Sequence, residues 1–196
     1  MKKDIVNATL GILVLTLLLG VLYPLVVTGI SQVAFPGNAN GQQIHLQGRL
    51  VGSKILGQNF DANPRYFQSR PSATTPPNNA AATTFSNLGP NSKATEKAIA
   101  TNIAAYLKLE KPYDPGLTAA QVPVDAANTS ASGVDPDISQ ANARIQAHRV
   151  AVVRHLSLAA VDKLIASDTA GRGLGFSGEP GVNVLELNLA LNRMAA

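Results

Sequence analysis

The sequence predicts an α+β protein: one N-terminal transmembrane helix, followed by a single mixed α+β extracytoplasmic domain. Two observations carry this prediction. No formally charged residue lies between Asp4 and Arg49, and that interval contains a long apolar run. Beyond it, short β-branched segments broken by glycines come first and helical patterns follow, rather than strands and helices in regular alternation, and this order is typical of the α+β class.

The apolar run predicts a transmembrane helix over residues 8–30. Its core, from Ala8 to Val27, has about twenty residues, and at 1.5 Å per residue this length matches the roughly 30 Å hydrocarbon core of a bilayer. A cleaved signal peptide is the alternative, but such peptides have apolar cores of about 7–15 residues and a cleavage site of small residues. The following SQVAFPG provides no such site, so a retained anchor is predicted.

Basic residues indicate the orientation of this span. Lys2 and Lys3 lie on its N-terminal side, and the next basic residue is Arg49. The positive-inside rule then leaves residues 1–7 as a short cytoplasmic N-terminus and places the rest of the chain outside the cytoplasm. We therefore predict a single-pass protein of the cell inner membrane with a periplasmic C-terminal domain.

One face of the span is suited to helix packing. Thr9, Thr16 and Gly20 share a helical face, and small residues allow a neighbouring helix to approach closely. Pro24 has no N–H to donate to the Gly20 carbonyl, so a kink is expected there. These four residues are the predicted contacts with a partner helix.

Residues 31–43 are expected to form a linker, and residues 44–196 a periplasmic domain. This domain should begin with one or two short strands in 44–60, followed by a long proline-rich loop over 61–91. Serine caps before apolar periodic segments predict three helices: from Asn91 or Ser92 to about Leu109, over 140–156, and over 158–167. Residues 121–124 are expected as an edge strand and 182–194 as a buried strand or helix.

Composition excludes several classes of function. The chain has no cysteine, which excludes disulfides, thiolate metal sites and a cysteine nucleophile. It carries a net charge of +4 from 16 basic and 12 acidic residues, without any run of Lys or Arg, so nucleic acid is not an expected partner.

The glycines Gly173, Gly175 and Gly178 spell G-x-G-x-x-G, a pattern of dinucleotide sites. Such a site needs a strand before the glycines and a helix N-terminus after them. Here a helical pattern precedes them and a strand-like segment follows, so a dinucleotide site is rejected. A P-loop lysine pattern is also absent from the sequence.

A membrane-anchored periplasmic hydrolase or metal-binding domain remains the alternative function. It requires a Ser132–His148–Asp135 triad, or a metal bound by His148 with Asp135 and Asp137. The sequence has no nucleophile elbow around Ser132. His148 and His155 are seven residues apart, about 10 Å along a helix, which is too far for one ion to bridge. Neither a catalytic site nor a metal site is therefore assigned.

The stretch NTSASGVDPDIS, residues 128–139, is interpreted as a turn that starts a helix. Gly133 supplies the turn, Asp135 and Asp137 flank a proline corner, and Ser139 caps the helix. The acidic corner is also a candidate partner contact.

Several strings along the whole chain resemble the C subunit of the Kdp potassium-transporting P-type ATPase. The resemblance rests on the following segments: VLYPLVVT in the span, GQNF at 57–60, YFQSRPSAT at 66–74, SNLGPN at 86–91, TSASGVDPDIS at 129–139, RVA at 149–151 and VNVLELNLAL at 182–191. RPSAT and SASGVDP are unusual strings. The chain departs from the family in NPRYF and in the glycine-rich AGRGLGFSGEPG.

This resemblance implies a non-catalytic accessory subunit of a high-affinity ATP-driven potassium uptake pump. Its implied partners are a channel-like potassium-translocating subunit, an ATP-hydrolysing P-type subunit, a small single-span subunit and the lipid bilayer. The family is described as a catalytic chaperone that raises the ATP affinity of the ATP-hydrolysing subunit. The predicted orientation conflicts with direct ATP contact, so ATP is expected at the partner subunit and no nucleotide-binding residue is assigned here.

The unusual strings provide the remaining candidate residues, for partner contact or for a structural motif. They are Arg70, Pro71, Ser72, Ser132, Gly133, Asp135 and Asp137.

Overall fold

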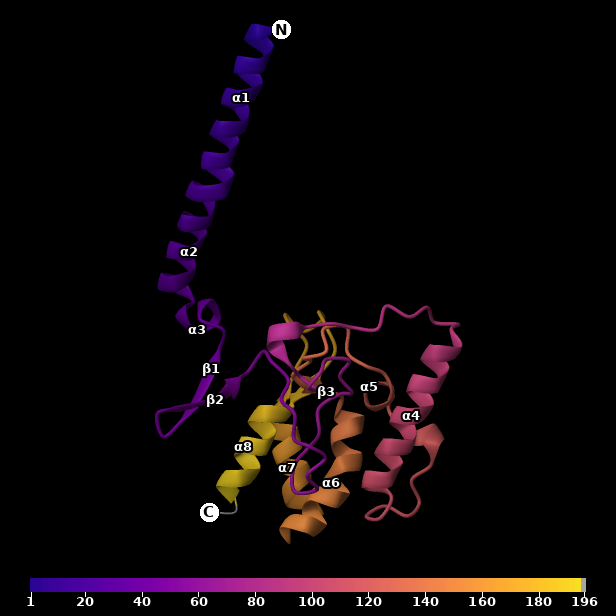
Figure 1. Cartoon of the computed structure of the whole chain (residues 1–196). Helices are drawn as coiled ribbons and strands as arrows, with labels where there is room; N and C mark the ends of the chain where they lie inside the picture. Colours follow the sequence, from indigo (N-terminus) through magenta and orange to yellow (C-terminus); the bar gives the residue numbers. More distant parts are fainter. Residues whose placement is uncertain (195–196) are drawn as a thin grey trace. The chain divides into compact units, whose positions relative to one another are not determined.

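The computed structural model describes residues 1–194. The chain divides into two compact units, Met1–Val51 and Gly52–Ala196 (Figure 1). The first unit is dominated by a long helix. The second combines helices with a small sheet, and the mixed fold class predicted from the sequence is confirmed.

The N-terminal helix runs through α1 (Lys2–Leu17), the π-helical segment η1 (Leu18–Leu22) and α2 (Tyr23–Ala34). As one element, Lys2–Ala34, it is long and apolar enough to cross a membrane. The disturbance expected at Pro24 takes the form of η1. The Tyr23 N–H donates to the Leu18 carbonyl, five residues back, so the helix continues through the proline with its backbone groups rearranged rather than ending there.

A short helix and a hairpin follow the long helix, and the boundary between the two units falls within the second strand of the hairpin. Helix α3 (Pro36–Ala39) follows the long helix, and strands β1 (Gln43–Leu46) and β2 (Arg49–Ser53) form a two-stranded sheet. The turn between them has φ of +51° at Gln47 and +78° at Gly48, and the glycine adopts this conformation without a steric penalty. The strands predicted in this region are confirmed.

The second unit contains three longer helices whose starts the serine caps correctly predicted. Ser92, Ser139 and Ser157 each accept a hydrogen bond from the backbone N–H three residues ahead. The elements of this unit are η2 (Ala80–Ala82), α4 (Lys93–Glu110), η3 (Ala119–Gln121), α5 (Val124–Ala127), β3 (Asp137–Ile138), α6 (Gln140–Arg154), α7 (Leu158–Ser167), β4 (Thr169–Ala170), β5 (Gly181–Asn183) and α8 (Val184–Met194).

The sheet of this unit is antiparallel with the order β3-β5-β4. The prediction of an edge strand at 121–124 is wrong: Pro123 is the N-cap of α5, with φ of −63°, and helix begins at Val124. The C-terminal segment predicted as strand or helix contains both, because β5 passes directly into α8.

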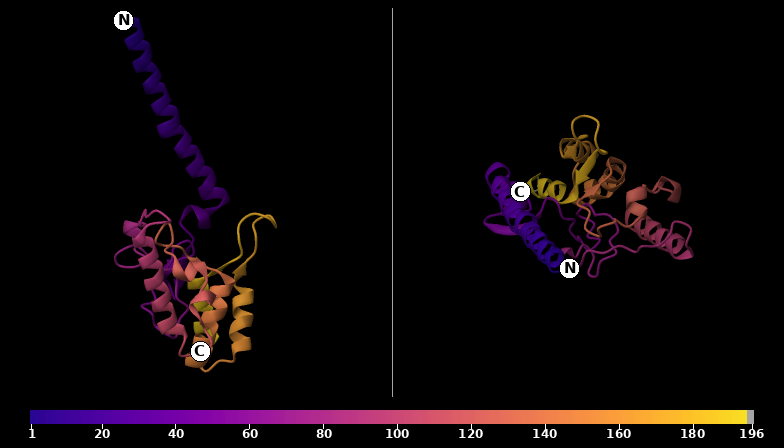
Figure 2. Two further views of the ribbon diagram at one scale, coloured as in Figure 1. Left: turned by 90° about the vertical axis from the view of Figure 1, so that its right-hand side faces the viewer. Right: turned by 90° about the horizontal axis from the view of Figure 1, so that it is seen from above.

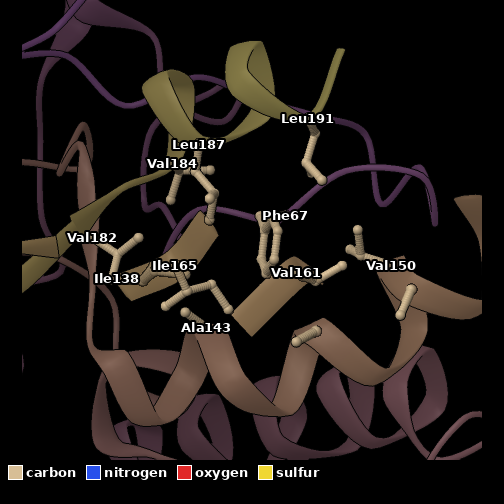
Figure 3. Close-up of a cluster of buried hydrophobic side chains, with 12 residues drawn as sticks. Phe67, Ile138, Ala143, Val150, Val161, Ile165, Val182, Val184, Leu187 and Leu191 are labelled. Atoms are coloured by element: carbon tan, nitrogen blue, oxygen red, sulfur yellow. The ribbon is translucent and has the colours of Figure 1, made fainter. Parts of the chain in front are cut away.

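Helices α6, α7 and α8 enclose the main hydrophobic core with the sheet (Figure 3). Phe67 lies at its centre although it belongs to no helix or strand. Its side chain is fully buried between Leu187 and Leu191 of α8 on one side and Val150 and Val161 on the other. An irregular segment therefore supplies the central aromatic of the core.

Candidate functional site

The segment 59–79 crosses the second unit in extended and turn conformations, and amide side chains from two helices hold it. The Phe67 N–H donates to Asn188 Oδ1 at 2.8 Å, and Asn188 Nδ2 donates to the Phe67 carbonyl at 2.9 Å. Gln146 holds the next residue in the same way: the Gln68 N–H donates to Gln146 Oε1 at 2.7 Å, and Gln146 Nε2 donates to the Gln68 carbonyl at 3.1 Å. Each amide takes the place of a neighbouring strand, which satisfies backbone groups that burial would otherwise leave without partners.

Arg149 is the central polar residue of this arrangement and is fully buried. Its Nε lies 3.0 Å from both carboxylate oxygens of Glu110. Nη1 donates to the carbonyls of Pro64 and Tyr66 at 2.6 and 2.9 Å, and Nη2 donates to Gln146 at 2.9 Å. Burial raises the pKa of Glu110 to about 7, against the opposing effect of the Arg149 charge and hydrogen bonds. One guanidinium thus joins α4, α6 and the extended segment.

The candidate residues Arg70 and Ser72 contact the acidic stretch 128–139 at a junction. Their partners, Asp135 and Gly133, lie 65 and 61 residues further along the chain. Arg70 Nη1 donates to Asp135 Oδ2 at 2.7 Å, and Ser72 Oγ donates to the Gly133 carbonyl at 2.6 Å. The Pro71 carbonyl accepts from the backbone N–H of Ser130 at 3.2 Å. The structure therefore brings five of the seven candidates, Arg70, Pro71, Ser72, Gly133 and Asp135, into one place.

The other two candidates, Ser132 and Asp137, flank the junction in the sequence, and the Asp137 N–H donates to Asp135 Oδ1 at 3.1 Å. The Ser132 hydroxyl is exposed and accepts from the Val134 N–H at 3.2 Å. Asp137 belongs to β3, where its Oδ1 accepts from Asn183 Nδ2 at 3.2 Å. Partial burial raises the pKa of Asp137, and the Asn183 hydrogen bond opposes that rise. Both residues serve the local geometry of the stretch.

Glycines allow the junction to close. The Gly57 N–H donates to the Val134 carbonyl at 2.7 Å, and a Cβ added at Gly57 would lie 2.5 Å from the Asp135 carbonyl oxygen. Gly133 has φ of +73°, and its added Cβ would lie 2.6 Å from Thr74. Side chains at these two positions are incompatible with the observed approach of the backbones.

The alternative of a triad or metal site finds no support in this geometry. His148 is exposed on α6 and borders a hollow with Arg144 and Asp162, whereas Asp135 is engaged by Arg70. Across residues 1–194, no hydrogen bond joins Ser132, His148 and Asp135, and no group of three or more His, Cys, Asp or Glu residues is placed to hold a metal ion.

A cleft of about 430 Å³ opens between α4 and the extended segment. Tyr106 of α4 lines it and donates to Asn142 Oδ1 at 2.8 Å. Burial raises the pKa of this hydroxyl, and the negative charge of Glu110 raises it further. The hydroxyl therefore stays protonated and remains a donor. The other walls combine amide side chains such as Gln58 and Asn102 with apolar ones such as Phe60 and Leu109. Within this lining the polar groups that form hydrogen bonds hold neighbouring segments of the chain, as Gln146 holds Gln68, and no nucleophile–base pair is formed.

Sequence reasoning missed the buried polar residues that hold the site together. Asn142, Gln146 and Arg149 lie at spacings of four and three on one face of α6, and each is at most 1% exposed. Polar residues at the spacing of a buried helical stripe are the signal that identifies such a set.

Comparison with known proteins identifies the family. The KdpC family, described as the c chain of the K⁺-transporting ATPase, matches residues 5–193. The chain belongs to this family. KdpC subunits named as parts of the potassium-transporting ATPase are 50% identical in Methylibium petroleiphilum, over 97% of both chains, and 49% identical in Methylococcus capsulatus, over 95% and 96%. The subunit of Mycobacterium tuberculosis H37Rv is 44% identical over 99% of this chain and 100% of its own.

The resemblance stated from the sequence is therefore confirmed, and the chain is a KdpC-type subunit of a potassium uptake pump. The match spans the apolar helix and the second unit alike. The junction of Arg70 with Asp135 and the fixation of Phe67 both lie inside the matched region.

Proposed function

We propose that this KdpC-type chain is a non-catalytic assembly subunit of an ATP-driven potassium pump. Its expected partners are a channel-like potassium-translocating subunit, an ATP-hydrolysing P-type subunit and a small single-span subunit. The relatives at 44–50% identity are all named as subunits of a potassium-transporting ATPase, which supports this placement.

The observation that carries the proposal is the use of the motif residues inside the fold. Arg70 binds Asp135, and Ser72 binds the Gly133 carbonyl. Arg149 donates its hydrogen bonds to Glu110 and to backbone carbonyls. Groups committed in this way are not free to perform proton transfer or nucleophilic attack. They instead give the second unit one rigid shape, which is the property an assembly surface requires.

The helix Lys2–Ala34 is the proposed membrane anchor. Lys2 and Lys3 at one end favour a cytoplasmic N-terminus and a periplasmic second unit. Gly20 and Thr16 form a small-residue face: a Cβ added at Gly20 would lie 3.8 Å from Thr16, its only neighbour within 4 Å in the described chain. This open face is suited to close packing against a helix of a partner subunit.

A periplasmic domain has no access to cytoplasmic ATP. Any increase in ATP affinity of the pump must therefore come from a coupling between distant sites, in which the subunit stabilises the conformation of the complex that binds ATP more tightly. This coupling distinguishes an assembly subunit with an allosteric effect from a nucleotide-binding subunit.

The proposal is tested by potassium uptake and purification in cells that lack this chain. We expect loss of uptake at micromolar external potassium and loss of co-purification of the remaining subunits, both restored by the wild-type gene. Alanine at Ser132 or at His148 should also restore both, since neither residue is committed to the junction. Intact uptake without the chain would refute the proposal, and loss of uptake with a fully assembled S132A or H148A pump would indicate chemistry at those residues.

A further inference from the structure

The loop between β4 and β5 carries two apolar side chains that the fold does not use. Leu174 is 90% exposed and Phe176 is 75% exposed, so each extends into solvent. The loop leaves the helices as an extended projection, coloured between orange and yellow in Figure 2. Exposed aromatic and aliphatic side chains at one tip, rather than scattered over a surface, indicate an interaction site.

The tip is a braced hairpin rather than a loose loop. Gly173 and Ser177 exchange two backbone hydrogen bonds, each 2.8 Å long. Next to them Arg172 Nη2 contacts both carboxylate oxygens of Glu179, at 2.9 and 2.7 Å. The brace fixes the direction of the tip, so little conformational entropy is lost when the tip binds.

Leu174 contradicts the local preferences of its turn. The Phe176 N–H donates to the Gly173 carbonyl at 3.2 Å, and the two residues between them, Leu174 and Gly175, have φ of +53° and +82°. Turns with two positive φ values favour asparagine or aspartate before glycine, and a leucine in this conformation is strained. A residue that is both strained and exposed is not explained by the stability of the hairpin, which points to a role in binding.

We propose that this tip, Arg172–Glu179, inserts Leu174 and Phe176 into the outer surface of the lipid bilayer. The inference rests on the membrane anchor of the proposed function. Between Arg172 and Glu179 the tip has no charged side chain, and those two residues neutralise each other in an ion pair. An uncharged tip with one aliphatic and one aromatic residue suits the boundary between headgroups and acyl chains.

The size of the tip favours lipid over a protein partner. Two such side chains offer on the order of 300–400 Å², whereas each partner in a standard protein–protein interface contributes roughly 800 Å². A lipid surface needs no shape-complementary partner. The connection 35–51 also tethers the second unit covalently to the anchor, with an extended length of at most about 60 Å. A tether of this length keeps the local concentration of bilayer high for a weakly binding tip.

The absence of tryptophan from the chain allows a direct test. The full chain carrying Phe176→Trp is reconstituted into vesicles whose acyl chains are brominated, and its fluorescence is compared with that in unbrominated vesicles. We expect a loss of tryptophan emission of this variant in the brominated vesicles, since bromine on the acyl chains quenches a tryptophan that lies among them. The matched control is Phe85→Trp, a half-exposed phenylalanine of a different loop, which should show no quenching.

A second variant separates binding from folding. Leu174→Asn, added to Phe176→Trp, suits the positive φ of the turn and should keep or raise the thermal stability while it reduces the quenching. If the protein floats with the vesicles and Phe176→Trp is quenched no more than Phe85→Trp, each relative to unbrominated vesicles, insertion of the tip is refuted but the membrane anchor is not. Failure of the chain to float with vesicles would overturn both. Shielding of the tryptophan in Phe176→Trp only after the other pump subunits are added would overturn lipid in favour of a protein partner.

Discussion

At the scale of single residues, the second unit depends on a buried ion pair that also carries hydrogen bonds. Arg149 and Glu110 are 0% and 1% exposed, and Nη1 of the guanidinium donates to two carbonyls of the extended segment. A buried pair of this kind contributes little net stability over an apolar substitute, but removal of one partner leaves an unpaired buried charge. Its value lies in joining three segments with fixed geometry.

This pair predicts a specific dependence of stability on pH. Glu110 has an ordinary pKa of 4.5 and a folded-state pKa of about 7. The folded chain therefore holds the proton more readily than the unfolded chain. The resulting stability is fully present below about pH 4.5 and is lost as the pH rises through about 7, by up to about 3 kcal/mol. Urea unfolding of the full chain in detergent, followed by circular dichroism across this range, measures the slope.

The matched variant for this prediction is Glu110→Gln, which keeps the shape and cannot titrate. In this variant the part of the pH dependence of the unfolding free energy that is due to Glu110 should disappear. The part due to Asp137, whose pKa is also raised by burial, should remain. An unchanged slope in Glu110→Gln would contradict the assignment of the titration to Glu110.

Gly57 provides a second prediction at the residue scale. A methyl group there would lie 2.5 Å from the carbonyl oxygen of Asp135, so Gly57→Ala must push apart the two segments of the junction. We expect a loss of about 1–3 kcal/mol in unfolding free energy. Gly89→Ala is the control, because its added Cβ meets nothing within 4 Å, and it should remain within about 0.5 kcal/mol of wild type. Equal stability of the two variants would show that the junction yields without cost.

At the scale of elements, the sequence predicts what local signals control. A serine followed by an apolar periodic segment contains both the cap and the buried face, and Ser92, Ser139 and Ser157 therefore correctly marked three helix starts. The strand β3 has two residues, too few for a periodic pattern, and its pairing with β5 depends on residues far along the chain.

The candidate site shows the same limit. Unusual strings drew attention to Arg70 and Asp135, but nothing in the sequence shows that they bind each other across 65 residues. The segment around Phe67 lacks periodicity because its backbone is satisfied by side chains, from Gln146 and Asn188, that lie 78 and 121 residues away. Contacts of that separation are set by the packing of the whole unit.

The N-terminal helix gives a prediction at the element scale. Gly20→Leu fills the small-residue face and should reduce co-purification of the other pump subunits several-fold, since close helix packing needs small residues there. Gly11→Leu is the matched control, because nine residues place it about half a turn away round the helix and its added Cβ meets nothing within 4 Å. Equal yields from both variants would refute a packing role for the face of Gly20. The core around Phe67 lies in the other unit, so thermal unfolding of that unit should be unaffected.

At the scale of the whole molecule, charge and hydrophobicity differ between the two units. The helix Lys2–Ala34 has no buried side chain in the structure, and its exposed apolar surface is suited to lipid or to a partner helix. The second unit buries its own core and satisfies its polar groups internally: among its described buried side-chain N and O atoms, only Arg70 Nε has no partner. The functional question at this scale is on which side of the membrane the second unit lies.

The lysines at one end of the helix predict that the second unit lies outside the cytoplasm. The chain has no cysteine, so an introduced cysteine is its only thiol and the location can be tested by labelling. Ser132→Cys places a thiol at an exposed position whose hydroxyl accepts a single backbone hydrogen bond. A membrane-impermeant maleimide should label it in intact spheroplasts. Asp4→Cys, at the other end of the helix, leaves both lysines in place and should be labelled only after the inner membrane is opened with detergent. Labelling of Ser132→Cys solely in inverted vesicles would place the second unit beside ATP, and the allosteric account of ATP affinity would then give way to direct contact.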